Sequence, residues 1–251
     1  MRIFITGASS GIGEGLARHY GAPGAHVGLL ARRGALLEDL ARALRDAGAR
    51  IETYPADVAD TAAVQRAVDA FLGAAGGADL VIANAGVTIE NSLQRGDAAS
   101  AARLMAINVI GVTNTIIPFV PVMLGQRAGT LAAVSSVAGF RGLPGRAAYS
   151  ASKAAVTTFM EGVRMTLHGT GVHAMAICPG YVRTPMTAEM RSPPFVLELD
   201  AAVRSMTRAI EAKAATYSLP WQMSLLRHVL GSAPEWLIRR AVPASRSRGT
   251  L

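Results

Sequence analysis

The chain has 251 residues, of which 51% are hydrophobic and 17% are charged, with 25 basic and 17 acidic side chains and a formal net charge of +8. A chain of this length and composition can bury a sizeable core, which excludes an intrinsically disordered protein. Its single cysteine, Cys178, excludes a disulfide framework and a cysteine-rich zinc site, and the five histidines show no ligand-like spacing, so we expect no metal.

Short apolar runs alternate with longer helical segments along the chain. The sequence predicts strands over residues 2–6, 25–31, 50–55, 79–83, 130–135, 172–178 and 215–220. It predicts a first helix that ends at residue 20 and further helices over residues 35–47, 61–74, 98–124 and 149–168. Helices between successive strands indicate right-handed βαβ crossovers and a parallel sheet. We therefore predict one α/β domain, a Rossmann-type doubly wound parallel sheet over residues 1–240.

A glycine-rich turn, Gly7-Ala8-Ser9-Ser10-Gly11-Ile12-Gly13, separates the first strand from the first helix. Glycine lets the backbone turn tightly and lets a pyrophosphate approach closely, and the amides at a helix N-terminus attract its negative charge. The position of this turn between strand and helix therefore predicts a dinucleotide site.

The end of the second predicted strand indicates which dinucleotide binds. Folds that prefer NAD place an acidic residue there for the ribose 2′-hydroxyl. This strand instead ends in Ala31-Arg32-Arg33. Arginine pairs well with phosphate, so we predict NADP(H), with Arg32 as the main contact of the 2′-phosphate and Ser9 as a helper. The alternative is that the two arginines are only solvated residues at a strand end.

Tyr149 and Lys153 are one helical turn apart and are expected on one face of the helix. A nearby cation favours the phenolate and lowers a tyrosine pKa from about 10. Such a tyrosine can exchange a proton with an alcohol or carbonyl oxygen. Ser136 follows the fifth predicted strand, at the sheet edge where such folds bind ligands. Its hydroxyl can bind a substrate oxygen, although it could equally be a turn cap.

The combined motifs resemble the short-chain dehydrogenase/reductase family over residues 1–190. The residues that carry the resemblance are Thr6-Gly7, Gly11-Ile12-Gly13, Asn84-Ala85-Gly86, Asn108, Ser136, Tyr149, Lys153 and Pro179-Gly180. The resemblance implies that the pyrophosphate and adenosine contact Gly7, Ser9, Ser10, Gly11, Ile12 and Gly13. It places Asp57 and Val58 beside the adenine and Asn84, Ala85 and Gly86 beside its ribose.

The same resemblance implies the catalytic roles. Tyr149 would be the general acid in the reductive direction, and Ser136 would polarise the substrate oxygen. Lys153 would bind the nicotinamide ribose and lower the pKa of Tyr149. Asn108 would hold a water that links Lys153 to solvent. The nicotinamide pocket would be shaped by Pro179, Gly180, Val182 and Thr184.

Two further segments lie outside the catalytic and cofactor-binding motifs. Residues 185–200 are expected to form a substrate lid, whose methionines and Phe195 favour an apolar or bulky substrate. Residues 221–240 are predicted to form extra C-terminal amphipathic helices. These helices could pack on the domain, form a subunit interface or lie on a membrane surface. Residues 241–251 are expected to be disordered.

The leading hypothesis is an NADPH-dependent reductase of an apolar ketone or aldehyde, or the reverse alcohol oxidation. The alternatives are a non-catalytic NADP(H)-binding redox sensor, an NAD-linked alcohol dehydrogenase and a membrane-associated reductase of a lipid ketone. Basic residues are scattered, except in the C-terminal tail, so we expect no nucleic-acid partner. No targeting segment or sufficiently long apolar run is visible, which favours a cytoplasmic protein. The resemblance suggests a homodimer or homotetramer built on the helices near residues 102–125 and 149–168.

Overall fold

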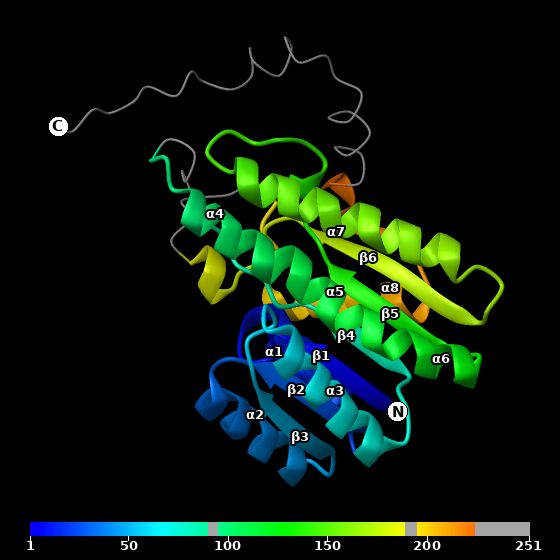
Figure 1. The fold of residues 1–251 in the computed structure, drawn as a ribbon. Helices are drawn as coiled ribbons and strands as arrows, with labels where there is room; N and C mark the ends of the chain where they lie inside the picture. Colours follow the sequence, from blue (N-terminus) through cyan, green and yellow to red (C-terminus); the bar gives the residue numbers. More distant parts are fainter. Residues whose placement is uncertain (90–94, 189–194, 224–251) are drawn as a thin grey trace.

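The computed structural model describes residues 1–89, 95–188 and 195–223 and shows one parallel sheet between two layers of helices (Figure 1). Its strands are β1 (Arg2–Thr6), β2 (His26–Ala31), β3 (Arg50–Pro55), β4 (Leu80–Ala83), β5 (Gly129–Val134), β6 (Val172–Pro179) and β7 (Thr216–Leu219). They are hydrogen-bonded in the order β3-β2-β1-β4-β5-β6-β7, and every pair is parallel. The predicted Rossmann-type α/β fold is confirmed.

Helices cover both faces of the sheet, because alternate residues of a strand point to opposite sides. The face that buries Ile3 and Ile5 of β1 is covered by α1 (Gly11–Tyr20), α2 (Gly34–Asp46) and α8 (Leu199–Glu211). The face that buries Phe4 is covered by α3 (Thr61–Ala75), α4 (Ala98–Met105), α5 (Gly111–Ile116), α6 (Val120–Gln126) and α7 (Ala147–Thr166). Burial on both sides explains why β4 is apolar along its whole length and why β1 is apolar between Arg2 and Thr6.

Helix α8 was not predicted from the sequence. The expected substrate lid ran to residue 200, whereas α8 already begins at Leu199. Apolar residues recur at positions 199, 202, 203, 206 and 210, and those from 202 onward are buried. This spacing is the helical signal that identifies α8.

The segment predicted as one helix over residues 98–124 is a helical run with two irregular turns. A π-helical turn occupies Ala106–Ile110, and a 3₁₀ turn occupies Ile117–Phe119. Pro118 and Pro121 lack the backbone N–H that a regular helix needs, which accounts for the second turn. The run Ala98–Gln126 has the length and apolar composition of a membrane-crossing helix, a candidate that the sequence analysis did not expect. Residues of this run such as Ile116 and Phe119 are buried in the core, and 44% of its apolar window is buried.

Parts of two sequence predictions lie outside the described residues. They are the centre of the expected lid, residues 189–194, and the C-terminal segment from residue 224, which includes nearly all of the predicted amphipathic helices and the tail. The described part of the lid contains a short 3₁₀ turn, Pro185–Thr187, and a parallel bridge between Val182 and Leu197.

Candidate active site

A cavity of about 450 Å³ opens at the carboxyl ends of the strands. β1 lies between β2 and β4, so the connections from its two sides diverge at this edge. Ligands of open α/β sheets bind at such a switch point. The cavity is lined by Gly7, Ser9, Ser10, Gly11, Ile12, Ala31, Arg32, Arg33, Ala56, Asp57, Val58, Asn84, Ala85, Gly86, Val87, Ile107, Val134, Ser135, Ser136, Tyr149, Lys153, Pro179, Gly180, Val182, Thr184, Pro185, Met186 and Thr187.

The structure brings nearly all of the sequence-predicted site residues to this one cavity. Gly13 and Asn108 are the exceptions, because neither lines it. Ala56 and Ile107 line the cavity but were not predicted as site residues, and Thr187, which also lines it, belongs to the expected lid. Ile107 directly precedes Asn108 in an otherwise apolar helix, and nothing in its own spacing distinguishes it from a core residue.

The glycine-rich turn has the geometry that the sequence analysis expected. Gly7 and Gly11 have φ angles of +68° and +57°, a region that favours glycine. A Cβ on Gly13 would overlap the carbonyl of Gly7 and lie 2.5 Å from Asn84 Nδ2. Asn84 Nδ2 donates hydrogen bonds to the carbonyls of Thr6 and Gly7, at 3.1 and 3.2 Å. Asn84, which directly follows β4, therefore fixes the glycine-rich turn. Gly13 permits this close packing because it has no side chain, and it does not line the cavity.

The structure shows a contact between an arginine and the glycine-rich turn that the sequence did not predict, whereas the role of Arg32 as the main contact of a 2′-phosphate stays a prediction. Arg33, not Arg32, donates to Ser9 Oγ, with Nη2 at 2.9 Å, and also to Ser10 Oγ at 2.6 Å. Arg32 lines the cavity, is exposed and has no polar partner among the described residues. Ser10 is the N-cap residue of α1, but its hydroxyl does not cap the helix. Because Arg33 follows Arg32 by one residue, local sequence could not show which guanidinium turns toward the loop.

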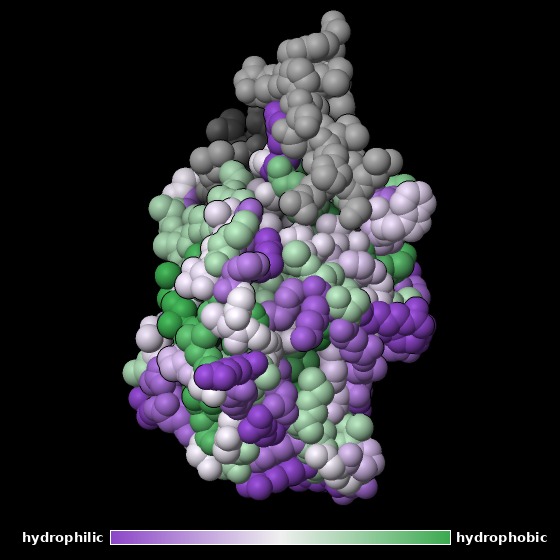
Figure 2. Space-filling model, turned by 90° about the vertical axis from the view of Figure 1, so that its right-hand side faces the viewer, coloured by the Kyte–Doolittle hydropathy of each residue, from purple (hydrophilic) through white to green (hydrophobic). Residues whose placement is uncertain are grey.

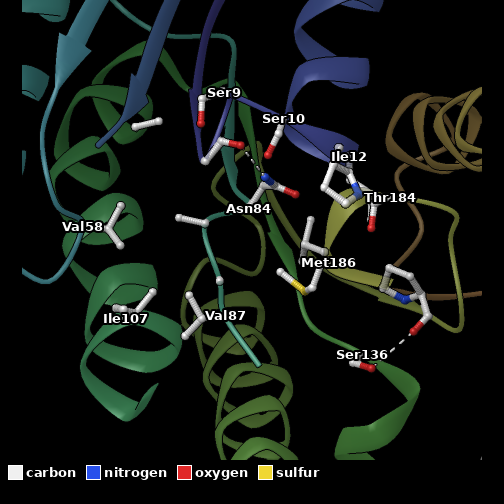
Figure 3. Close-up of a pocket in the computed structure, with 18 of the residues that line it drawn as sticks. Ser9, Ser10, Ile12, Val58, Asn84, Val87, Ile107, Ser136, Thr184 and Met186 are labelled. Carbon is white, nitrogen blue, oxygen red and sulfur yellow. Dashed lines mark hydrogen bonds between the residues drawn. The ribbon is translucent and has the colours of Figure 1, made fainter. Parts of the chain in front are cut away.

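The two ends of the cavity differ in character (Figure 3). At one end Val58, from the segment after β3, and Ile107, from the π-helical turn, lie on the same side of the cavity, and we call this end the apolar slot. Ser9 and Ser10 lie beside Asn84, while Met186 and Ser136 lie toward the opposite end. An apolar slot at one end and hydroxyl groups at the other suit a long ligand that has both planar and polar parts.

Tyr149 and Lys153 lie on the first turns of α7, and Ser136, two residues after the end of β5, is the N-cap residue of a short 3₁₀ turn. Lys153 Nζ is 5.9 Å from the centre of the Tyr149 ring. Ser136 Oγ accepts a hydrogen bond from the Ala138 amide at 3.1 Å and donates to the Pro179 carbonyl at 3.4 Å (Figure 3). The three side chains therefore meet in one cavity.

Burial dominates the electrostatics of Tyr149. Burial raises the pKa of Tyr149, and the neighbouring Ser136 hydroxyl only partly opposes this. Burial also lowers the pKa of Lys153 to about 8. The net direction of the Tyr149 pKa is therefore upward, because the cost of burying a phenolate dominates. A lowering of this pKa by Lys153 stays a prediction.

Asn108 is fully buried and is fixed by its neighbours rather than facing the cavity. Its Oδ1 accepts from the Val87 amide at 2.8 Å, and its Nδ2 donates to the Val87 carbonyl and to Ser152 Oγ, each at 3.0 Å. A Cβ on Gly86 would lie 3.3 Å from Asn108 Oδ1 and 3.4 Å from Lys153 Nζ, so Asn108 and Lys153 flank Gly86. A water relay through Asn108 stays a prediction.

The site residues fit a nicotinamide dinucleotide. Lys153 is 5% exposed, and its ammonium makes one hydrogen bond with the described residues, to the Val134 carbonyl at 2.9 Å. An ammonium has three N–H donors, so two are left for ribose hydroxyls. The glycine-rich turn and the uncapped start of α1 suit a pyrophosphate.

Comparisons with known proteins agree with this site. The family model described as short chain dehydrogenase matches residues 1–194. An uncharacterized oxidoreductase of Myxococcus xanthus is 40% identical over 222 residues, which are 88% of each chain.

Two solved structures are similar to the whole fold. A short-chain dehydrogenase/reductase of Burkholderia phymatum in complex with NAD has a TM-score of 0.85, 25% identity and coverage of 99% of this chain and 98% of its own. A short-chain dehydrogenase of Sphingobium yanoikuyae in complex with NADPH has a TM-score of 0.81, 26% identity and 98% coverage of both chains. With its fold, glycine-rich turn and Ser136, Tyr149 and Lys153 in one cavity, the chain belongs to the short-chain dehydrogenase/reductase family of oxidoreductases that act on alcohol and carbonyl groups.

Proposed function

We propose that the chain is an NADPH-dependent reductase of apolar ketones or aldehydes that also catalyses the reverse alcohol oxidation. When bound, the dihydronicotinamide supplies a hydride. Tyr149 donates its phenolic proton to the carbonyl oxygen, and Ser136 hydrogen-bonds that oxygen. Lys153 holds the nicotinamide ribose through its unused N–H groups, and its charge favours the phenolate that Tyr149 leaves behind.

The observation that carries the preference for NADPH is the arginine pair at the end of β2. Arg32 and Arg33 both line the cavity, and no acidic residue stands at this strand end. Arg33 is already oriented by Ser9 and Ser10, whereas Arg32 is exposed and has no polar partner among the described residues. Two guanidinium groups can bracket a 2′-phosphate, while a carboxylate in their place would repel it.

We expect the wild-type chain to bind NADPH at least about tenfold more tightly than NADH, a difference of about 1.4 kcal/mol. Arg33→Ala and Arg32→Ala should each weaken NADPH binding, because each removes charge-assisted hydrogen bonds to phosphate. The double substitution should abolish the preference and leave NADH binding nearly unchanged. Titration of each protein with both cofactors, followed by nicotinamide fluorescence, measures this.

Arg42→Ala is the matched control, because Arg42 is an exposed arginine of α2 that does not line the cavity. It should leave the NADPH-to-NADH ratio as in the wild type. Equal or tighter binding of NADH by the wild-type chain would refute the assignment of the arginine pair and favour an NAD-linked alcohol dehydrogenase.

An apolar substrate is supported by the residues around the nicotinamide end. Met186 lines the cavity and is 51% exposed. Phe195 and Trp221 are also exposed. Phe195 is two residues before Leu197, which forms a β-bridge with the cavity residue Val182. Trp221 is two residues before Met223, which lies against the cavity residue Gly180. Exposed methionine and aromatic side chains beside a site suit an apolar ligand. Membrane contact through residues 221–240 stays a proposal for which Trp221 is the main described support.

A second copy of the chain is the partner that we propose for the α4–α6 surface. No charged residue occurs between Arg103 and Arg127, and Ile110, Ile117 and Leu124, seven residues apart, are 47%, 55% and 39% exposed. Figure 2, which brings this side of the molecule to its left-hand edge, shows hydrophobic residues gathered there. Self-association would bury them.

The oligomer proposal is tested by Ile117→Glu. The wild type should sediment as a dimer or tetramer, and the variant should sediment as a smaller species because a carboxylate cannot be buried there without a partner. Leu36→Glu is the control, because Leu36 is 43% exposed on α2, in the opposite helical layer. A monomeric wild type, or unchanged sedimentation of the Ile117 variant, would contradict the proposal.

A further inference from the structure

Arg103 of α4 forms an ion pair with Asp57, which follows β3. Arg103 Nη2 donates to Asp57 Oδ2 at 2.6 Å, between residues that are 46 positions apart in the chain. The Asp57 side chain is 25% exposed and the Arg103 side chain 53%. Arg103 itself does not line the cavity, whereas Asp57 does.

Both oxygens of the Asp57 carboxylate are therefore oriented. Oδ1 accepts the backbone N–H of Ala59 at 3.0 Å, and Oδ2 accepts Arg103. A carboxylate oxygen can accept more than one hydrogen bond, so each keeps acceptor capacity. Two fixed contacts stop the carboxylate from rotating away from the cavity wall.

Asp57 lines the same cavity as Val58 and Ile107. These two apolar residues mark the apolar slot at one end of that cavity (Figure 3). Val58 is the next residue after Asp57, and Ile107 lies one helical turn beyond Arg103. Arg103 and Ile107 therefore act on the same site in two ways. Ile107 forms an apolar wall for the flat ring of a base, and Arg103 holds the Asp57 carboxylate at the edge of that ring. A base with an amino group at that edge would donate a hydrogen bond to the Asp57 carboxylate, and a base with a carbonyl group there would not.

We propose that Arg103 is a positioning residue that holds Asp57 so that the site selects a 6-aminopurine over a 6-oxopurine dinucleotide. The inference rests on the proposed function, because it takes the dinucleotide to bind with its base in the Val58–Ile107 slot. An ionised carboxylate only accepts hydrogen bonds. It therefore accepts the exocyclic N–H of adenine and repels the carbonyl oxygen of hypoxanthine. Without Arg103, one oxygen is free to turn toward solvent and this selection weakens.

The test compares the binding of NADPH with that of its analogue in which hypoxanthine replaces adenine, again by nicotinamide fluorescence. The wild type should bind NADPH about tenfold more tightly than the analogue, the effect of one hydrogen bond to a charged group. Arg103→Met should reduce this ratio to about twofold or less by weakening NADPH binding. Arg103→Lys should restore part of it, because the observed contact uses a single nitrogen.

Two further variants separate positioning from general effects. Arg42→Met removes an exposed positive charge from α2, outside the cavity lining, and should keep the wild-type ratio. Asp57→Ala should abolish the selection, and Arg103→Met should then have no additional effect, because Arg103 acts through Asp57.

Three results would overturn the inference. One is a wild-type chain that binds both dinucleotides equally, because Asp57 would then not read the base. Another is an Arg103→Met variant that has a lower melting temperature but an unchanged ratio, because the ion pair would then be only structural. A wild type that binds neither dinucleotide would refute the proposed function itself and this inference with it.

Discussion

Tyr149→Phe is expected to lower the rate of carbonyl reduction by about 10²- to 10⁴-fold, the usual contribution of a positioned general acid. Phenylalanine keeps the ring that packs at the start of α7 but has no proton to donate. The binding of NADPH should change little, because Lys153 and the glycine-rich turn are untouched. Steady-state turnover with a ketone substrate, measured together with a fluorescence titration of NADPH, separates the two effects.

Tyr20→Phe is the matched control for this substitution. The Tyr20 hydroxyl is buried and has no hydrogen-bond partner among the described residues. Its removal therefore breaks no hydrogen bond among the described residues and should leave turnover and cofactor binding unchanged. If Tyr149→Phe kept wild-type turnover, Tyr149 would not be the general acid. If the wild type bound NADPH tightly but reduced no carbonyl compound in a broad screen, the redox-sensor alternative would gain support.

Gly13→Ala is expected to abolish tight cofactor binding and to destabilise the fold by about 1–3 kcal/mol, the usual cost of inserting a methyl group into a tightly packed region. The new methyl group would overlap the backbone carbonyl of Gly7, which cannot rotate away as a side chain can. Either α1 or the glycine-rich turn must shift, and the hydrogen bonds from Asn84 to Thr6 and Gly7 would lengthen. Thermal unfolding and the NADPH titration measure the two effects.

Gly73→Ala makes the same chemical change where there is room for it. Gly73 lies inside α3, and a Cβ there meets nothing within 4 Å. Because alanine is a better helix former, this variant should gain up to about 1 kcal/mol and keep wild-type cofactor binding. If the Gly13→Ala variant were as stable as the wild type and bound NADPH as tightly, the turn would tolerate a side chain. That result would contradict the packing described above.

Local patterns predicted the strands and helices that are strongly periodic, but not all elements. The first strand, the glycine-rich turn and the following helix were located correctly because strand, turn and phosphate-binding residues are adjacent in sequence. Helix α8 was not predicted although its apolar spacing is regular, because its first residues, 199 and 200, were assigned to the substrate lid. The π-helical turn around Asn108 was also missed, because sequence periodicity predicts a continuous helix there.

The sequence by itself determined the fold class and the pairing of Tyr149 with Lys153, because these depend on hydrophobic periodicity and on residues one helical turn apart. Its motifs also carried the resemblance to the family. Only the tertiary structure decided that Arg33 reaches the glycine-rich turn, that Ile107 completes the apolar slot and that Arg103 holds Asp57. It also showed that burial raises the pKa of Tyr149. Such contacts join distant segments and depend on how the helices pack on the sheet, so no local pattern contains them.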